Sequence, residues 1–251
     1  MTEPTAAVLD RFRSEVERVV PVVALWAHGS LAAGDYQAGR SDMDLVAVTA
    51  GTADLPGPRL RDLHRQLARQ LPLARHLHCA YAPESRLADP SARHLTWAEG
   101  RFVDRPLSAV TRRELHAGGL VLAGPAPADL LAPVSDAELV EFLKADLTGF
   151  WLPATGHPIR WLWDIWVDLG PLTVARATVT LRDGRLITKR EALAVLAELD
   201  APAALVEDIT RRRYRLPAGS APRFPPVRRI RRARLARTFT RAQILRAVGQ
   251  H

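Results

Sequence analysis

The chain has 251 residues, of which 47% are apolar and 25% charged, as in a globular protein with one large domain or two modest ones. No apolar run approaches the ~20 residues that a membrane span needs, and the N-terminal residues show no secretory signal pattern, so we expect a cytoplasmic protein with no membrane partner. Cys79 is the only cysteine, which excludes an intrachain disulfide and a cysteine-based zinc site.

The formal net charge of +8 is unevenly distributed along the chain. Residues 211–251 hold 13 arginines and no acid, so the other 210 residues carry 22 basic and 27 acidic side chains, a net of −5. A basic end of this kind suits a solvated surface or a phosphate-binding one. Only three aromatic residues interleave with these arginines. The segment therefore shows no base-stacking platform, and we expect no nucleic-acid partner.

The spacing of apolar residues predicts an α/β arrangement in the first half of the chain. Residues 83–105 show no clear pattern. The expected elements are a helix over 5–20, strands over 22–27 and 44–50, a helix over 59–71 and a strand over 76–82.

Hydroxyl residues followed three positions later by glutamate predict helix starts with a capping box. Beyond residue 135 the pattern is nearly all helical, with a Pro-rich loop at 216–226 before a last basic helix. We therefore expect an α+β fold with two domains: 1–134, a mixed β-sheet with flanking helices, and 135–251, all helical. The capping pairs are Thr111 with Glu114, Ser135 with Glu138, and Thr188 with Glu191.

Two aspartates follow a small-residue turn in the segment HGSLAAGDYQAGRSDMDLVAV, residues 28–48. Asp42 and Asp44 share one face of a strand, because successive strand side chains alternate. Two carboxylates that close repel each other unless a cation lies between them. Oxygen ligands with open positions suit Mg²⁺, so this pair is the candidate metal site.

The turn before the aspartates has the features of a phosphate-binding loop. Gly29 lets the backbone approach a ligand closely, and Ser30 opens a short helix whose N–H groups face an anion. Ser41 adds a hydroxyl beside the first aspartate. The combination favours a triphosphate held by the turn with its metal on the aspartates. The alternative is an ordinary turn with solvent-exposed aspartates.

This segment resembles the nucleotidyltransferase superfamily that includes DNA polymerase beta. In that family Gly-Ser precedes a Ser-Asp-x-Asp strand by about ten residues, and GSLAAGDYQAGRSDMDLVAV matches throughout. The resemblance implies that the first domain is a nucleotidyltransferase domain. It also implies transfer of a nucleoside monophosphate from a nucleoside triphosphate to an acceptor, with release of pyrophosphate.

Two later segments, GLVLAGPAPADLL and ARATVTLRDGRLITKREAL, resemble the streptomycin/spectinomycin adenylyltransferases. In those enzymes a C-terminal helical domain completes the cleft with an arginine and, thirteen residues later, a lysine that reach the nucleotide. Arg176 and Lys189 have this spacing, and Lys189 is one of two lysines in a chain with 33 arginines. The resemblance implies ATP as substrate, Mg²⁺ as cofactor, and the hydroxyl of a small acceptor, of the aminoglycoside kind, as the group modified.

The third carboxylate of the family is missing from the strand HLHCAYA. His78 stands in its place and is the candidate catalytic base, since imidazole titrates near neutral pH, although it is a poor Mg²⁺ ligand. A histidine packed at a strand edge is the alternative. A competing function is therefore a nucleotide-binding regulator with little or no activity, like the antitoxin members of the superfamily. A third, suggested by the basic end, is transfer to a nucleic-acid 3′ end.

The acceptor site is expected from the segment HLTWAEGRF, since the resembling enzymes use a Trp- and Glu-bearing segment there. Trp97 and Glu99 are its candidates, and Asp168, with Asp164, is expected to face the same cleft. Acidic and aromatic groups suit a polycationic aminosugar. For the tryptophans around Asp164 the alternative is hydrophobic packing. The sequence specifies neither the acceptor nor the oligomeric state.

Overall fold

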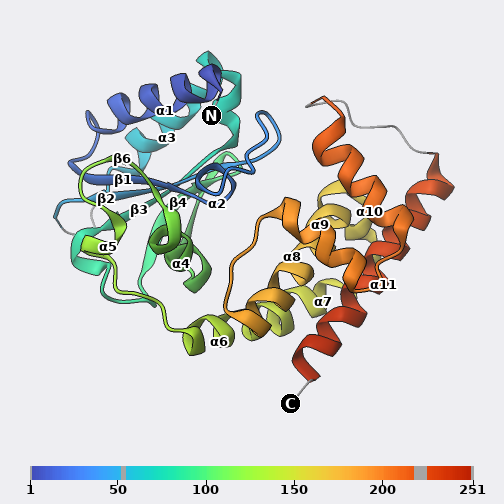
Figure 1. The fold of residues 1–251 in the computed structure, drawn as a ribbon. Helices are drawn as coiled ribbons and strands as arrows, with labels where there is room; N and C mark the ends of the chain where they lie inside the picture. Colours follow the sequence, from blue (N-terminus) through green and yellow to red (C-terminus); the bar gives the residue numbers. More distant parts are fainter. Residues whose placement is uncertain (1, 52–54, 218–224, 250–251) are drawn as a thin grey trace. The chain divides into compact units, whose positions relative to one another are not determined.

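The computed structural model describes residues 2–51, 55–217 and 225–249. They form two compact units, residues 1–134 and 135–251 (Figure 1). Most of the Pro-rich loop predicted at 216–226 lies outside the described residues. No helix in the described ranges is long and apolar enough to cross a membrane.

The first unit contains a six-stranded mixed sheet, which confirms the α+β expectation. The strand order is β5-β4-β3-β2-β1-β6. Strands β2 and β3 run parallel, and the other neighbouring pairs run antiparallel. The strands are β1 (Val22–His28), β2 (Met43–Thr49), β3 (Leu77–Pro83), β4 (Arg93–Ala98), β5 (Arg101–Pro106) and β6 (Leu120–Ala123).

Helices flank this sheet on both sides, with α1 and α3 on one face and α4 on the other (Figure 1). Helix α1 ends earlier than predicted, because its last turn tightens before Pro21: the Val19 N–H bonds the Val16 carbonyl at 3.0 Å. The helices are α1 (Glu3–Val16), α2 (Gly29–Ala32), α3 (Gly57–Gln70), α4 (Ala109–Gly118) and α5 (Pro127–Leu130), with 3₁₀ turns η1 (Pro72–His76) and η2 (Glu84–Arg86).

Alternation along the strands divides the apolar side chains between two cores. From Ala24 onward, odd-numbered residues of β1 to β3 pack on α1 and α3, and even-numbered ones pack on the α4 side. The first core includes Phe12, Leu25, Met43, Leu45, Leu60, Leu77 and Tyr81. The second includes Ala24, Trp26, Val46, Val48, Ala80, Ala82, Leu107 and Leu115.

The structure assigns one stretch of this unit that the sequence left without a prediction, and it corrects one expectation. The stretch without a clear pattern, 83–105, forms most of the β4–β5 hairpin. Helix α4 starts one turn earlier than the Thr111–Glu114 pair predicted, because the hydroxyl of Ser108 accepts the Thr111 N–H at 3.0 Å and is the N-cap. Glu114 therefore lies in the middle of α4 and is available for another contact.

The second unit is all helical, as predicted. The predicted caps are confirmed: Ser135 accepts the Glu138 N–H, and Thr188 with Glu191 forms a capping box. The helices are α6 (Asp136–Asp146), α7 (Leu152–Ala154), α8 (Asp164–Asp183), α9 (Lys189–Glu198), α10 (Ala203–Thr210) and α11 (Pro226–Gly249), with π turns η3 (Leu147–Trp151) and η5 (Arg211–Arg215) and the 3₁₀ turn η4 (Pro158–Leu162).

A buried ion network links α8, α10, η5 and α11 in this unit. The carboxylate of Asp208 accepts the Nε–H groups of Arg212 at 3.2 Å and Arg232 at 2.6 Å. Arg232 also reaches Asp164 at 2.9 Å, and Arg212 donates to Asp168 at 2.7 Å. The basic C-terminal segment is thus partly internal, because these arginines neutralise aspartates of the preceding helices.

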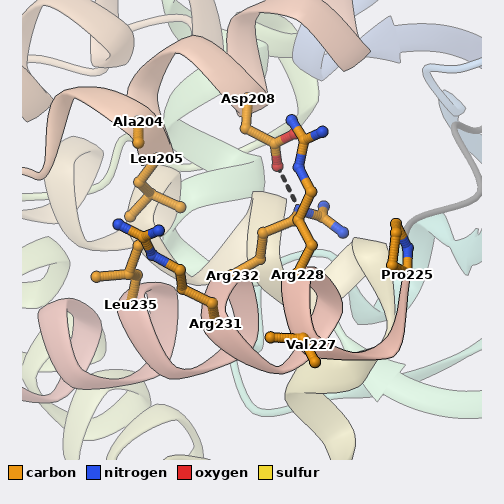
Figure 2. Close-up of a pocket in the computed structure, with 9 residues that line it drawn as sticks. All are labelled: Ala204, Leu205, Asp208, Pro225, Val227, Arg228, Arg231, Arg232 and Leu235. Atoms are coloured by element: carbon orange, nitrogen blue, oxygen red, sulfur yellow. Dashed lines mark hydrogen bonds and ion pairs between the residues drawn. The ribbon is translucent and has the colours of Figure 1, made fainter.

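A pocket of about 510 Å³ lies beside this network, between α10 and α11 (Figure 2). Its wall combines the Asp208–Arg232 pair with further arginines and apolar side chains. None of the predicted site residues lines it. The lining residues are Ala204, Leu205, Asp208, Pro225, Val227, Arg228, Arg231, Arg232 and Leu235.

Replacing Asp208 by alanine is expected to lower the free energy of unfolding by about 3–5 kcal/mol, because two buried guanidinium groups lose their shared carboxylate. Glu207→Ala is the matched control, since the Glu207–Arg215 pair is exposed and is expected to contribute less than about 1 kcal/mol. Urea unfolding followed by circular dichroism compares the two variants. Equal losses in both would show that the Asp208 network does not stabilise the unit.

A buried histidine in the first unit makes stability depend on pH. His64 on α3 contacts the Tyr81 hydroxyl at 2.7 Å and stacks on Trp97. Burial lowers the pKa of His64 to about 3, with a smaller effect of the charge on His78. The folded state therefore holds His64 neutral at pH values where the unfolded state, with a pKa of 6.5, binds a proton.

The free energy of unfolding is thus expected to fall as pH drops from 6.5 towards 3, by about 2–3 kcal/mol between pH 6.5 and 4.5 from this group. His64→Gln removes the titrating group, so the stability gap between wild type and variant should narrow over this interval. Urea titrations at both pH values measure the gap. A gap that does not change with pH would contradict the assignment.

Candidate active site

Asp42 and Asp44 lie on one side of the sheet, as predicted, at the beginning of β2. Met43 between them is fully buried in the core beneath α1 and α3. The two carboxylates are therefore directed to the opposite side, where their side chains are 48% and 33% exposed. The buried methionine fixes which way the acidic pair faces.

His78 lies directly beside Asp44, because parallel pairing aligns the two residues across β2 and β3. Its Nδ1 is 3.6 Å from Asp44 Oδ1, and its Nε2 is 3.9 Å from Asp42 Oδ1. His76 adds a second imidazole, 3.6 Å from Asp42 Oδ1. The structure thus brings the predicted base and both aspartates together.

The pKa of His78 reflects this acidic setting. Burial lowers the pKa, but the hydrogen bond to Asp44 and the charges of Asp42 and Asp44 together raise it above the ordinary histidine value. The positive charge of Arg105 has a smaller lowering effect. An imidazole that gains a proton at this position lessens the repulsion between the two carboxylates.

Two features of the structure favour glycine at position 29: its backbone conformation and the closeness of Asp44. Its φ of +62° lies in the left-handed region that favours glycine. A Cβ atom at this position would stand 3.0 Å from Asp44 Oδ2. The turn therefore passes against one of the two carboxylates, and a side chain there would push on it.

The two serines have different surroundings. Ser41 is 2% exposed, and its hydroxyl accepts the Gln37 N–H at 3.1 Å, so it fixes the loop that leads into Asp42. Ser30 is half-buried in α2, and its carbonyl accepts the Asp35 N–H at 3.0 Å. Both serines therefore belong to the segment that joins Gly29 to the aspartates.

Of the two acceptor candidates in this unit, Glu99 is the one that lies beside His78. Glu99 and Gly100 form the two-residue turn of the β4–β5 hairpin, both with positive φ, as in a type I′ turn. The Glu99 N–H lies 3.4 Å from His78 Nε2. Trp97 is 5% exposed and stacks on His64 at a ring distance of 4.7 Å, on the opposite face of the sheet from Asp44.

The predicted residues of the second unit form a separate group. The Nε–H of Arg176 donates to the Ile187 carbonyl at 2.8 Å, which holds α8 against the chain just before Lys189, the first residue of α9. Asp168 belongs to the buried ion network, where burial raises its pKa to about 6 although Arg212 lowers it. Its carboxylate is thus already paired with an arginine.

Sequence reasoning missed one contact in the first unit. The Nδ1 of His28, the last residue of β1, lies 3.0 Å from Glu114 Oε2 on α4. The sequence could not indicate this pair, because 86 residues separate its members and Glu114 fits a capping pattern. The pair lies where β1 ends and the turn at Gly29 begins.

The donor set of the aspartates fits a partly open Mg²⁺ site. Mg²⁺ is usually held by one or two carboxylates, with waters and substrate phosphates in the other positions. Within the described ranges, no three or more Asp, Glu, His or Cys side chains are grouped as a metal site. A cation here would therefore rest on Asp42 and Asp44, since Mg²⁺ prefers oxygen to the imidazole of His78.

Gly29→Ala is expected to lower the free energy of unfolding by about 1–2 kcal/mol, because alanine is strained at positive φ and its Cβ meets Asp44. Gly57→Ala is the matched control, since a Cβ there meets nothing within 4 Å at the start of α3. Thermal and urea unfolding of both variants test this. A loss no larger than that of Gly57→Ala would show that the turn tolerates a side chain.

Comparison with known proteins agrees with this geometry. No curated protein matches the chain. The crystal structure of spectinomycin adenyltransferase AAD(9) from Enterococcus faecialis with ATP and spectinomycin matches with a TM-score of 0.68 and 12% identity, over 94% of this chain and 98% of that one. At this identity the match shows a common fold. Residues 9–89 match the model of the nucleotidyltransferase domain family, and the N-terminal unit of this chain therefore carries a nucleotidyltransferase domain.

Proposed function

We propose that the protein transfers a nucleoside monophosphate, AMP from ATP, to a hydroxyl group of a small acceptor. The observation that carries this proposal is the placing of Asp42, Asp44 and His78 on one sheet face beside the Gly29 turn. The nucleotidyltransferase domain supports it, as does the fold shared with an adenylyltransferase that was crystallised with ATP and spectinomycin.

In this mechanism the first unit supplies the phosphate and metal contacts. Gly29, Ser30 and Ser41 seat the triphosphate, and Asp42 and Asp44 hold Mg²⁺. When bound, the ion would neutralise phosphate charge and polarise the phosphorus–oxygen bonds. From the second unit, Arg176 and Lys189 are proposed to add positive charge to the triphosphate, with Lys189 as a compact point charge.

Transfer itself requires one bond to form and one to break. The acceptor oxygen bonds to the α-phosphorus, and the bond from that phosphorus to the bridging oxygen of pyrophosphate breaks. The acceptor hydroxyl loses its proton to a base, and His78 is the group on this face suited to take it. Its position beside both carboxylates supports this role.

For the acceptor we retain a small hydroxyl compound of the aminoglycoside kind. Glu99 is the best supported of the proposed contacts, because it is exposed and lies in the hairpin turn next to His78. Trp97 and Asp168 are the weaker members of this proposal, since one is buried on the other sheet face and the other is paired with Arg212.

The second candidate function is a nucleotide-binding regulator without transferase activity. The observation that favours it is the imidazole of His78 in the place where the family has a third carboxylate. A His78→Glu variant separates the two. Turnover of labelled ATP that appears only in this variant would support the regulator, and strong wild-type turnover would exclude it.

Asp42→Asn and Asp44→Asn are expected to abolish the rise in melting temperature that ATP with Mg²⁺ produces, because each removes one of two metal-holding carboxylates. The melting temperature without ligand should change little, since both side chains are substantially exposed. Asp62→Asn on α3 is the control. Thermal shift assays and transfer of labelled AMP to a panel of aminoglycosides test the proposal.

An undiminished thermal shift in Asp42→Asn would place the metal site elsewhere. Binding of ATP with no acceptor ever labelled would exclude the aminoglycoside acceptor while leaving nucleotide binding intact.

A further inference from the structure

His28 and Glu114 form a half-buried pair at the base of the Gly29 turn. The imidazole Nδ1 lies 3.0 Å from Glu114 Oε2, and the side chains are 14% and 18% exposed. A carboxylate only accepts hydrogen bonds, so Nδ1 is the donor. The contact joins the end of β1 to α4 and sets the orientation of the ring.

The strand register places this histidine next to the acidic pair. His28 is the partner of Asp44 across β1 and β2, and Asp44 is the partner of His78 across β2 and β3. Residues opposite each other on neighbouring strands share a face, so the three side chains form a row at strand spacing, ~4.8 Å apart. Asp44 therefore stands between two imidazoles.

The two histidines in this row have different partners. His78 lies against the aspartates themselves, whereas the Nδ1 of His28 is committed to Glu114. The two ring nitrogens are separated by Cε1 and their N–H directions diverge, so Nε2 does not face Glu114 while Nδ1 does. In the described part of the chain no hydrogen-bond partner of this Nε2 is found.

We propose that His28 is a further nucleotide-contacting residue, which donates a hydrogen bond from Nε2 to a phosphate oxygen of the nucleoside triphosphate, and that Glu114 is its positioning residue. The inference rests on the proposed function, because it needs a triphosphate on the turn that begins at Gly29. Donation from both ring nitrogens requires a proton on each of them, and Glu114 and the bound phosphate are the two acceptors that would hold those protons.

The charges of the site support a cation at this position. A triphosphate would bring further negative charge to a sheet face that already holds two aspartates. The turn between Gly29 and Gly39 contains no arginine or lysine, and the chain flanks it with His28 on one side and Arg40 on the other. Glu114 holds the His28 ring in place at its end of the turn.

The test uses isothermal titration with α,β-methylene-ATP and Mg²⁺, and with AMP, on the full chain. His28→Phe keeps an aromatic ring and removes both nitrogens, so affinity for the triphosphate should fall about tenfold or more, while affinity for AMP stays the same. His116→Phe is the matched control, because His116 lies on α4 and contacts the Ala132 carbonyl instead. It should bind both nucleotides as the wild type does.

Glu114→Gln tests the positioning role, because it keeps an acceptor oxygen and loses the charge. Affinity for the triphosphate should fall by a smaller factor than in His28→Phe, and the double variant should bind no more weakly than His28→Phe alone. This variant replaces one polar side chain by another of the same size, so it serves as the test if His28→Phe does not fold. Glu84→Gln, at an exposed acid on η2, is its control.

Equal affinity of wild type and His28→Phe for the triphosphate would overturn the inference and leave the proposed function standing. Equal loss of AMP and triphosphate affinity would show that the pair only maintains the fold of the turn, and would also overturn it. A wild-type protein that binds neither nucleotide would overturn both proposals.

Discussion

Two carboxylates held on one face of a strand end repel each other, and the surroundings of Asp42 and Asp44 are organised around that repulsion. Met43 is fully buried in the core, and this fixes both aspartates on the opposite face of the strand. The neighbouring strand brings His78 within 3.6–3.9 Å of both, and His76 stands 3.6 Å from Asp42. On the other side the turn at Gly29 leaves room for Asp44 because it lacks a Cβ. The acidic pair thus has two imidazoles on one side and, at Gly29, space for the Asp44 carboxylate on the other.

This arrangement bears on the chemistry of a nucleotidyltransferase domain that lacks a carboxylate on β3. An imidazole there can neutralise the aspartates when no cation is bound, and it can accept a proton near neutral pH, which a carboxylate of ordinary pKa does poorly. It contributes little to holding Mg²⁺. We therefore propose that His78 serves proton transfer and not metal binding. In the alternative function, as a regulator without activity, His78 transfers no proton.

The helical unit uses charge in a different way. Arg212 and Arg232 are buried and paired with aspartates of α8 and α10, where removal of one partner is costly because a charge would remain in a poorly solvated place. Asp168 belongs to this network. The sequence suggests a ligand-binding role for the basic segment and an acceptor-binding role for Asp168, but in the structure Arg212 pairs with Asp168. Part of the positive charge of the C-terminal segment is therefore neutralised by aspartates of the same unit.

The sequence by itself determined the features that depend on local spacing. Alternation put Asp42 and Asp44 on one face, the apolar runs identified β1 to β3, and the capping residues Ser135 and Thr188 identified two helix starts, since each of these depends on residues a few positions apart. The superfamily was also readable, because its motif is continuous. Only the tertiary structure decided the contacts between distant segments: His78 beside both aspartates, Trp97 in the core against His64, Asp168 with Arg212, and Glu114 with His28. Strand register and helix packing set these distances, and neither is fixed by the order of residues along one segment.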